Sequence, residues 1–183
     1  MDEETLNKAK IKEYCEKYPF LRWYGDPLYM GYSEDGEPAD DYTWEDEMPE
    51  GWRKAFCPQI WDELKAILEK ADYVDKFRFA QIKEKWGELR MYHCGAPEQI
   101  YDEVEELLND YSKRSVDVCI DCGEPSTRMM LGWIKYVCDD CAKTKELGWH
   151  IPKSDIDAFY EDRDAYIETH KAELDANCRH YGD

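Results

Sequence analysis

The spacing of the cysteines constrains the fold of this chain more than any other feature of its sequence. Two C-x2-C pairs are separated by fifteen residues, and their members are Cys119, Cys122, Cys138 and Cys141. Two residues between paired thiols let one tight turn aim both sulfur atoms at a single ion, and Gly123 suits such a turn. The insert is long enough for a short hairpin that brings the pairs face to face. We therefore expect an integral four-cysteine zinc ribbon that holds one structural Zn(II) ion.

Four thiolates complete a tetrahedron around zinc and leave no position for water, so the expected role of the ion is structural. Sequence signatures of catalytic zinc are missing. The chain has no His-x-Glu of the kind found in zinc deaminases and no His-Glu-x-x-His of metallopeptidases. Residues 123–137 contain no histidine that could act as a base between the pairs. The alternative interpretation is four reduced cysteines in an apolar core.

A second metal ion could be bound by residues outside this spacing, namely Cys15, Cys57, His93, Cys94, Cys178 and His180. A lone cysteine more often behaves as a small buried hydrophobic residue, and we prefer that interpretation. Eight cysteines in a cytoplasmic protein are expected to be thiols or metal ligands rather than disulfides.

The charge of the chain limits its partners. Its 183 residues carry 43 acidic and 24 basic side chains, which gives a formal charge of −19. General binding of nucleic acid or of an acidic membrane needs a dense Lys/Arg surface, so neither is expected. An aromatic fraction of 14% distinguishes the chain from disordered acidic tails and predicts a packed core. The chain has no apolar run of about 20 residues and begins with acidic residues, so we expect a cytoplasmic location.

Hydrophobic periodicity predicts an α+β fold. Apolar residues at helical spacing predict helices at 2–18, at 58–70, from 97 onward and at 155–178. A turn at Trp86-Gly87-Glu88 separates two alternating stretches, which predict strands at 76–83 and 89–94. Ser154, with Asp157 three residues later, predicts a variant capping box at the start of the last helix. The expected fold is helices packed on a small antiparallel β-hairpin, with the zinc ribbon as an integral part.

We expect four segments along the chain. They are an N-terminal helix with an acidic, aromatic-rich segment (1–50), a helix–hairpin–helix core (51–116), the zinc ribbon (117–152) and a C-terminal acidic helix (153–183). Residues 1–50 carry a charge of −10 and residues 153–183 carry −5. The two ends of the chain are therefore its acidic parts.

Residues 24–50 contain ten carboxylates and no Lys or Arg, interspersed with aromatic residues. Carboxylates on a rigid surface can replace the phosphates of nucleic acid in a basic groove of another protein, which gives fast association and strong salt dependence. Aromatic side chains are common anchors at the centre of such a contact. The candidate partner-binding residues are Glu34, Asp35, Glu37, Asp40, Asp41, Tyr42, Trp44, Glu45, Asp46 and Glu47. A charge that serves only solubility is the alternative interpretation.

Two stretches together carry a resemblance to a known group of proteins. Residues 81–92 read QIKEKWGELRMY, and residues 119–141 read CIDCGEPSTRMMLGWIKYVCDDC. This order resembles uncharacterised small proteins of bacteria and their phages, which pair a QIKEKFGxLRFY-like hairpin with a CxxCG…GW…CxxC zinc ribbon. The likeness covers roughly residues 51–142, and Trp86 stands where the motif usually has phenylalanine. The resemblance implies a phage or prophage origin, and hence a bacterial host cytoplasm, and it supplies no catalytic residues.

The first functional hypothesis is a non-enzymatic, phage-encoded, acidic zinc-binding protein. It would bind and inhibit a basic-surfaced host protein, either a defence protein or one that processes nucleic acid, by nucleic-acid mimicry. Direct nucleic-acid binding is not expected of such a protein. The sequence identifies neither the target protein nor the oligomeric state.

Two other hypotheses stay open. A zinc-ribbon module for nucleic acid or for a transcription complex would use the basic residues Arg128, Lys135, Lys143 and Lys145, although residues 119–152 sum to −1. Residues 76–92 carry +3 with interleaved aromatic residues, a pattern found in single-strand binding, but packing of these aromatic residues in a core explains it as well. A hydrolase could use Asp40, Asp41 and Asp46 with Mg(II), yet no spacing singles out an acid/base pair.

Overall fold

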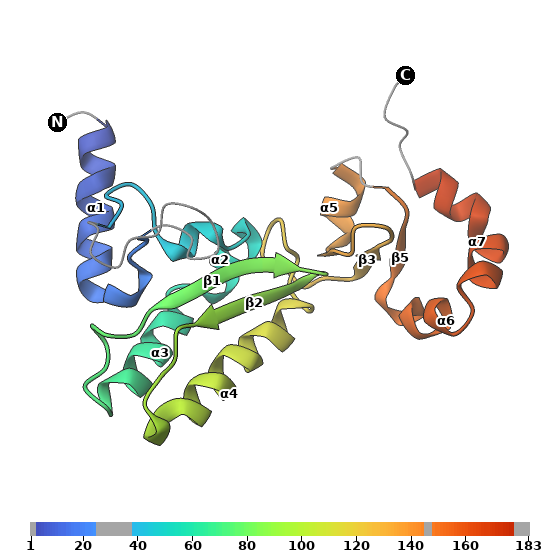
Figure 1. Ribbon diagram of the computed structural model, residues 1–183. Coiled ribbons are helices and arrows are strands. Elements are labelled where there is room, and N and C mark those ends of the chain that lie inside the picture. Colours follow the sequence, from blue (N-terminus) through green and yellow to red (C-terminus); the bar gives the residue numbers. More distant parts are fainter. Residues whose placement is uncertain (1–2, 25–37, 145–147, 178–183) are drawn as a thin grey trace. The chain divides into compact units, whose positions relative to one another are not determined.

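The computed structural model describes residues 3–24, 38–144 and 148–177, which form an α+β fold (Figure 1). Within them lie the helices α1 (Glu3–Lys17), α2 (Glu50–Phe56), α3 (Gln59–Glu69), α4 (Glu98–Ser115), α5 (Asp139–Thr144), α6 (Ile156–Glu161) and α7 (Arg163–Asn177). Two small antiparallel sheets contain β1 (Phe79–Lys85) with β2 (Glu88–His93), and β3 (Arg128–Met130) between β4 (Tyr136–Val137) and β5 (His150–Pro152). The expected α+β class is confirmed. No helix in these ranges is long and apolar enough to cross a membrane.

The chain folds as two compact units, each of which combines non-consecutive stretches. The first unit draws on residues 1–49, 56–84 and 89–112, and the second unit draws on residues 50–55, 85–88 and 113–183. Residues 50–55 thus pack with the cysteine-containing part of the chain, although they lie far from it in the sequence. The division of the chain into four consecutive segments, expected from the sequence, remains a prediction.

Aromatic side chains form the centre of the first unit. The ring of Phe20 lies 6.3 Å, between centroids, from each of the rings of Trp61, Phe77 and Phe79. Trp61 also contacts Phe79 at 5.8 Å, and all four rings are buried. Tilted and edge-to-face contacts of this kind add about 0.5–1.5 kcal/mol per pair beyond the burial of apolar area. The cluster joins the segment after α1 to helix α3 and strand β1.

β1 and β2 form the expected hairpin, but its turn is tighter than the sequence predicts. β1 continues to Lys85 and leaves only Trp86 and Gly87 between the strands. Both residues have a positive φ, of 58° and 79°, which is the conformation of a two-residue type I′ turn. Such a turn matches the twist of the strands, although a positive φ is uncommon for a large side chain. The turn holds Trp86 with 75% of its surface exposed.

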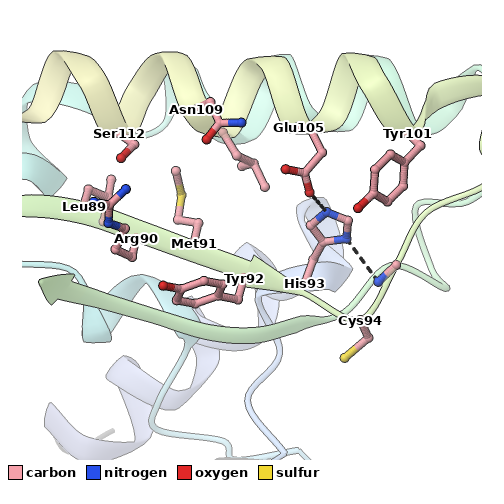
Figure 2. A pocket seen from close by; sticks show the side chains of 12 residues that line it. Leu89, Arg90, Met91, Tyr92, His93, Cys94, Tyr101, Glu105, Asn109 and Ser112 are labelled. Carbon is pink, nitrogen blue, oxygen red and sulfur yellow. Dashed lines mark hydrogen bonds and ion pairs between the residues drawn. The ribbon is translucent and has the colours of Figure 1, made fainter.

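Helix α4 lies beside β2 in the first unit, and His93 connects the two elements (Figure 2). His93 Nε2 lies 2.8 Å from Glu105 Oε1, and the N–H of Gly95 donates to His93 Nδ1 at 3.1 Å. Because Nδ1 accepts a hydrogen bond, the proton of the neutral ring is on Nε2 and is donated to Glu105. The side chain of His93 is buried and both of its nitrogens are engaged, so this histidine is a structural link.

The second unit is built on β3, which has a partner strand on each side. Arg128 lies opposite Val137 of β4, and Met129 lies opposite Ile151 of β5. The β3–β4 hairpin falls within the fifteen-residue insert between the cysteine pairs, where a short hairpin was expected. The apolar core of this unit consists of Met129, Ile151, Phe159, Tyr166 and Leu174. This core packs α6 and α7 against the sheet.

The C-terminal helix differs from the sequence prediction. A single helix was expected over 155–178, but Asp162 leaves the helical conformation, with a φ of −146°, and separates α6 from α7. Its Oδ1 accepts a hydrogen bond from the N–H of Ala165 at 3.0 Å, so Asp162 is the N-cap of α7. The expected capping box at Ser154 is wrong. Ser154 lies in a short 3-10 helix, and its hydroxyl donates to Asp155 Oδ1 instead.

Candidate metal centre

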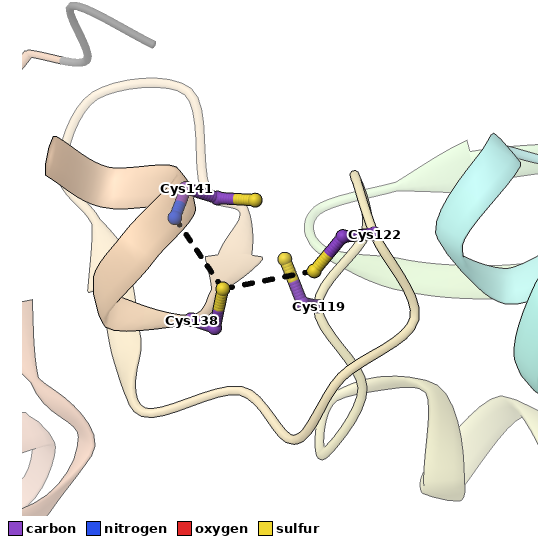
Figure 3. A group of neighbouring side chains, drawn as sticks. All are labelled: Cys119, Cys122, Cys138 and Cys141. Atoms are coloured by element: carbon purple, nitrogen blue, oxygen red, sulfur yellow. Dashed lines mark hydrogen bonds between the residues drawn. The ribbon is translucent and has the colours of Figure 1, made fainter. Parts of the chain in front are cut away.

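Four cysteine side chains converge in the second unit (Figure 3). Cys119 and Cys122 lie on the loop after α4, Cys138 lies between β4 and α5, and Cys141 lies on α5. Their sulfur atoms all lie within 4.8 Å of one another, and Cys122 Sγ is 3.6 Å from Cys138 Sγ. The structure therefore brings together the four residues that the spacing predicts as ligands.

Two tight turns position the sulfur atoms. Gly123 has a φ of +88°, and its N–H donates to the carbonyl oxygen of Cys119 at 3.0 Å, which closes the turn around the first pair. A side chain would be strained at this φ, which accounts for the glycine. In the second pair, the N–H of Cys141 points to Cys138 Sγ at 3.4 Å, because α5 begins between the two residues.

One backbone and one side-chain hydrogen bond hold the two turns next to each other. The N–H of Ile120 donates to the carbonyl oxygen of Tyr136 at 3.0 Å, which ties the first turn to β4. On the other side, Arg128 Nε of β3 donates to Asp139 Oδ1 at 2.5 Å, at the start of α5. This hydrogen bond lowers the pKa of the Asp139 carboxyl. The sheet and α5 thus fix the second pair relative to the first.

Helix α2 supports the first turn although it lies far before it in the sequence. The N–H of Gly51 donates to the carbonyl oxygen of Ile120 at 2.9 Å. A Cβ atom on Gly51 would lie 2.1 Å from the carbonyl oxygen of Cys119, so only glycine fits here. The next residue, Trp52, is buried and its Nε1 donates to the carbonyl oxygen of Ser115 at 3.1 Å. The first cysteine turn therefore rests directly on the backbone of α2.

The thiols of Cys119 and Cys141 differ in their tendency to ionise. Burial opposes ionisation of Cys119, but hydrogen bonds from the backbone of Cys138, Asp121 and Cys122 outweigh it and lower the pKa of this thiol. Burial and the neighbouring sulfur atoms raise the pKa of Cys141 well above its usual value. Four thiolates this close repel one another, so ionisation of the whole group is coupled to binding of a cation.

The donor set fits a tetrahedral, thiophilic metal ion. A tetrahedron with metal–sulfur distances of about 2.3 Å has edges of about 3.8 Å. The distance of 3.6 Å between the sulfur atoms of Cys122 and Cys138 is close to such an edge. Soft sulfur donors select ions such as zinc or iron over magnesium and calcium. The four cysteines can therefore hold one metal ion, and a four-coordinate ion would have no position left for a substrate.

No second group of three or more possible ligands occurs in the part of the chain that the structure describes. Cys15 is buried, Cys57 is half-buried and Cys94 is exposed. His93 uses both ring nitrogens in the contacts with Glu105 and Gly95. Two more of the predicted ligands lie outside the described residues, namely Cys178 and His180.

The predicted partner-binding residues are only partly placed. Glu34, Asp35 and Glu37 lie outside the described residues. Asp40 and Asp41 are exposed. An ion pair joins Asp40 Oδ2 to Lys8 Nζ of α1 at 3.2 Å. These two aspartates are therefore accessible to a partner.

Trp44 is not the exposed anchor that the sequence predicts. Its indole is only 4% exposed and contacts the ring of Trp23 with centroids 6.5 Å apart. Tyr42 is half-buried against the same Trp23 ring at 5.4 Å, and its hydroxyl donates to Glu47 Oε1 at 2.9 Å. The prediction for Trp44 is wrong because alternating aromatic and acidic letters do not show which side chains face inward.

Two of the predicted carboxylates have structural partners inside the first unit. Glu45 Oε2 accepts hydrogen bonds from Tyr14 Oη at 2.6 Å and from Trp61 Nε1 at 2.5 Å. Asp46 Oδ2 accepts the N–H and the hydroxyl of Thr43, both at 2.8 Å, in a capping box for the 3-10 helix Trp44–Glu47. The hydrogen bonds of Glu45 attach this part of the acidic segment to α1 and α3, and those of Asp46 fix its local conformation.

The Glu45→Ala variant is expected to lower the free energy of unfolding by about 2–4 kcal/mol, because two donors lose their acceptor and the indole N–H of Trp61 is buried. Burial and the hydrogen bond to Glu45 raise the pKa of Tyr14, so its hydroxyl stays protonated and donates. Urea unfolding followed by tryptophan fluorescence measures the loss. Glu47→Ala is the matched control, because its hydrogen bond is exposed and should contribute less than about 1 kcal/mol. Equal losses in both variants would contradict the structural role of Glu45.

Two features of the molecule have no counterpart among the sequence-based predictions. Trp133, in the turn between β3 and β4, is 71% exposed. A cavity of about 410 Å³ lies between β2 and α4. The Gly132-Trp133 pair is a turn signal that could have revealed the first feature. The cavity depends on the packing of two separate elements, and no local pattern indicates it.

The chain was compared with protein-family models, with curated proteins and with solved structures, and none of them matches. The chemistry of the cysteine cluster and the charge of the surface therefore carry the functional inference.

Proposed function

We propose that this protein is a non-enzymatic, zinc-binding protein that acts by binding a basic-surfaced protein. Four sulfur atoms within 4.8 Å of one another support the zinc site, because they match a closed tetrahedral donor set. The β3–β4 hairpin between the cysteine pairs supports a zinc ribbon as the local fold. An ion saturated by four thiolates cannot bind a substrate, so its role is to hold the two turns together.

The observation that carries the binding proposal is the attachment of residues 38–50, the described part of the acidic segment, to the core of the first unit. Glu45 ties these residues to Trp61 of α3 and Asp46 caps their 3-10 helix, while Asp40 and Asp41 are exposed among them. Carboxylates held on these residues present negative charge at defined positions, as the phosphates of a nucleic acid do. The overall charge of −19 extends the attraction to longer range at low salt.

The class of target follows from this chemistry. A groove lined with Lys and Arg that normally holds DNA or RNA is complementary to such a surface, so the proposed mode of action is inhibition by nucleic-acid mimicry. The resemblance of residues 51–142 to proteins of bacteria and their phages adds a proposed phage origin. The proposed target is then a defence or nucleic-acid-processing protein in the cytoplasm of a bacterial host.

A pull-down of the tagged protein from nuclease-treated bacterial lysate tests this proposal. The expected result is one dominant basic partner that is retained at low salt and released at high salt. The Asp40→Lys/Asp41→Lys variant should recover about tenfold less of this partner, because it reverses two exposed charges at the contact. Glu45 and Asp46 stay unchanged in this variant because their carboxylates hold the segment in place.

The matched control is Glu168→Lys/Asp175→Lys, which makes the same change in net charge at exposed residues of α7. This control should recover the partner as the wild type does. Equal recovery with both variants would contradict a contact at Asp40 and Asp41. The binding proposal as a whole would be contradicted if no salt-sensitive partner were captured.

A zinc-ribbon module for single-stranded nucleic acid is the second candidate, and exposed aromatic residues of the second unit favour it. Trp86 and Trp133 are both exposed, and Lys85 Nζ lies 5.8 Å from the centroid of the Trp86 ring. Exposed rings beside cations can stack with bases without regard to sequence. A partner that disappears when the lysate is treated with nuclease would support this candidate over the first.

A further inference from the structure

The cavity between β2 and α4 has walls from both elements (Figure 2). Seven consecutive residues, 89–95, line one side of it. Because side chains alternate between the two faces of a strand, lining by consecutive residues indicates that the cavity lies along the edge of β2. The other side is formed by one face of α4, with Tyr101, Glu105, Leu108 and Asn109.

The edge of β2 at this cavity is open to a further strand. In the ranges that the structure covers, β1 is the one strand neighbour of β2. The two-residue turn pairs Lys85 with Glu88, and the alternation of an antiparallel ladder then directs the backbone N–H and C=O groups of Met91 and His93 away from β1. An extended peptide can form β-sheet hydrogen bonds with such groups.

Two exposed tyrosines line the same cavity. Tyr92 is 45% exposed and Tyr101 is 43% exposed, and both are among the largest apolar side chains left on the surface. The faces of tyrosine rings attract cations. Lys83 Nζ already lies 5.7 Å from the centroid of the Tyr92 ring, so this ring is placed to accept a positive charge. The cavity therefore offers aromatic surface for a cationic side chain.

Helix α4, which forms one wall of the cavity, is acidic. Helix α4 carries six carboxylates before its last turn, on Glu98, Asp102, Glu103, Glu105, Glu106 and Asp110. Of these, Glu103 is neutralised by an ion pair with Lys70. Among the residues that line the cavity, Glu105 is the carboxylate and Arg90 is the Arg/Lys cation, and the basic residues of α4 follow only in the last turn of the helix. The acidic helix that forms this wall favours a basic ligand over an acidic one.

We infer that the groove between the open edge of β2 and α4 binds an extended, basic segment of a protein partner. The segment adds a third strand to the β1–β2 hairpin through Met91 and His93. Its lysine or arginine side chains reach Glu105 and the rings of Tyr92 and Tyr101. This inference rests on the proposed function, in which the partner has a basic surface, and it locates a contact for that partner.

Fluorescence anisotropy with a labelled nine-residue peptide of alternating lysine and valine tests the inference on the full chain. Valine favours the extended conformation, and a peptide with glutamate in place of lysine keeps this propensity with the opposite charge. We expect the lysine peptide to bind at low salt and the glutamate peptide not to bind. In the bound state, hydrogen exchange at the amides of Met91 and His93 should slow by about tenfold or more.

Variants at the edge separate backbone pairing from side-chain contacts. Met91→Pro removes the outward N–H and leaves the hairpin hydrogen bonds in place, so it should weaken peptide binding by about tenfold. Met91→Ala keeps the N–H and should bind within about twofold of the wild type. Glu105→Gln still accepts from His93 but has no charge, so binding should weaken by about fivefold. Glu168→Gln on α7 removes the same charge far from the groove in the sequence and should bind as the wild type does.

Each outcome supports or contradicts the binding of a basic segment in the groove. Peptide binding that is unchanged in both Met91→Pro and Glu105→Gln would overturn it, as would equal binding of the two peptides. Absence of any binding by the lysine peptide would overturn it too. In each of these cases the lysate partner would still be captured if the proposed function holds, and it would be lost only if that function fails. If Met91→Pro lowers the melting temperature, Glu105→Gln and the exchange of the two amides decide alone.

Discussion

The Cys119→Ser/Cys122→Ser variant is expected to contain no zinc and to lose the native structure of the cysteine-containing part of the second unit. Serine hydroxyls do not ionise near neutral pH and do not replace thiolates as zinc ligands. Structural zinc sites contribute on the order of 10 kcal/mol to folding, which is comparable to the whole stability of a typical domain. The loss of two ligands therefore removes more stability than any other pair of substitutions that we consider.

Metal analysis and thermal unfolding followed by circular dichroism check this expectation. Cys94→Ser is the matched control, because Cys94 is an exposed thiol that lies outside the cluster. The control should retain one zinc ion per chain and the melting temperature of the wild type. A double variant that also kept the native melting temperature would show that zinc does not stabilise the fold.

The Gly51→Ala variant is expected to destabilise the second unit by about 3 kcal/mol or more, although Gly51 touches no metal ligand side chain. A Cβ atom at this position would meet the carbonyl oxygen of Cys119 at 2.1 Å and the carbonyl carbon of Ile120 at 2.6 Å. These are backbone atoms, so they cannot rotate away. The substitution must move either α2 or the first cysteine turn, and it should therefore also weaken zinc binding.

Zinc affinity in competition with a chelator and urea unfolding measure the two effects of Gly51→Ala. Gly148→Ala is the control, because a Cβ atom there meets nothing within 4 Å. The control should change neither quantity by more than about 0.5 kcal/mol. Wild-type stability and affinity in Gly51→Ala would contradict the packing of α2 against the cysteine turn.

Local patterns in the sequence predicted the elements that local forces determine. Helical periodicity located both ends of α1 and α3, and the start of α4, to within one residue. A buried apolar stripe determines α3 and α4. The cysteine spacing identified all four members of the cluster for a similar reason. Each C-x2-C pair is positioned by its own turn, and only the approach of the two pairs needs longer-range contacts.

The structural features that the sequence did not predict depend on contacts between residues that lie far apart in the chain. Helix α2 was not predicted as a separate helix, and its packing against the cysteine turn depends on Gly51 and Ile120, which lie far apart in the chain. The break at Asp162 was missed because one side-chain hydrogen bond ends the periodic pattern there. The groove along β2 exists only once α4 is packed beside it.

The acidic segment shows the same limit for individual side chains. Composition predicted an acidic segment with aromatic residues, but it assigned Trp44, Glu45 and Asp46 to a partner. In the structure Trp44 is buried, Glu45 accepts two hydrogen bonds from the first unit and Asp46 caps a 3-10 helix. The identity of an acidic residue does not show whether its carboxylate faces solvent or accepts a hydrogen bond from a buried indole N–H. That depends on hydrogen-bond partners that lie far away in the sequence.

Native mass spectrometry of the wild-type chain, purified without added metal, tests whether the four cysteines hold a structural zinc ion. We expect one zinc ion per chain. Removal of this ion by a chelator should expose the thiols of Cys119, Cys122, Cys138 and Cys141 to alkylation. A chain that carries no metal, that carries a different metal, or that joins these cysteines in disulfides would contradict a structural zinc site.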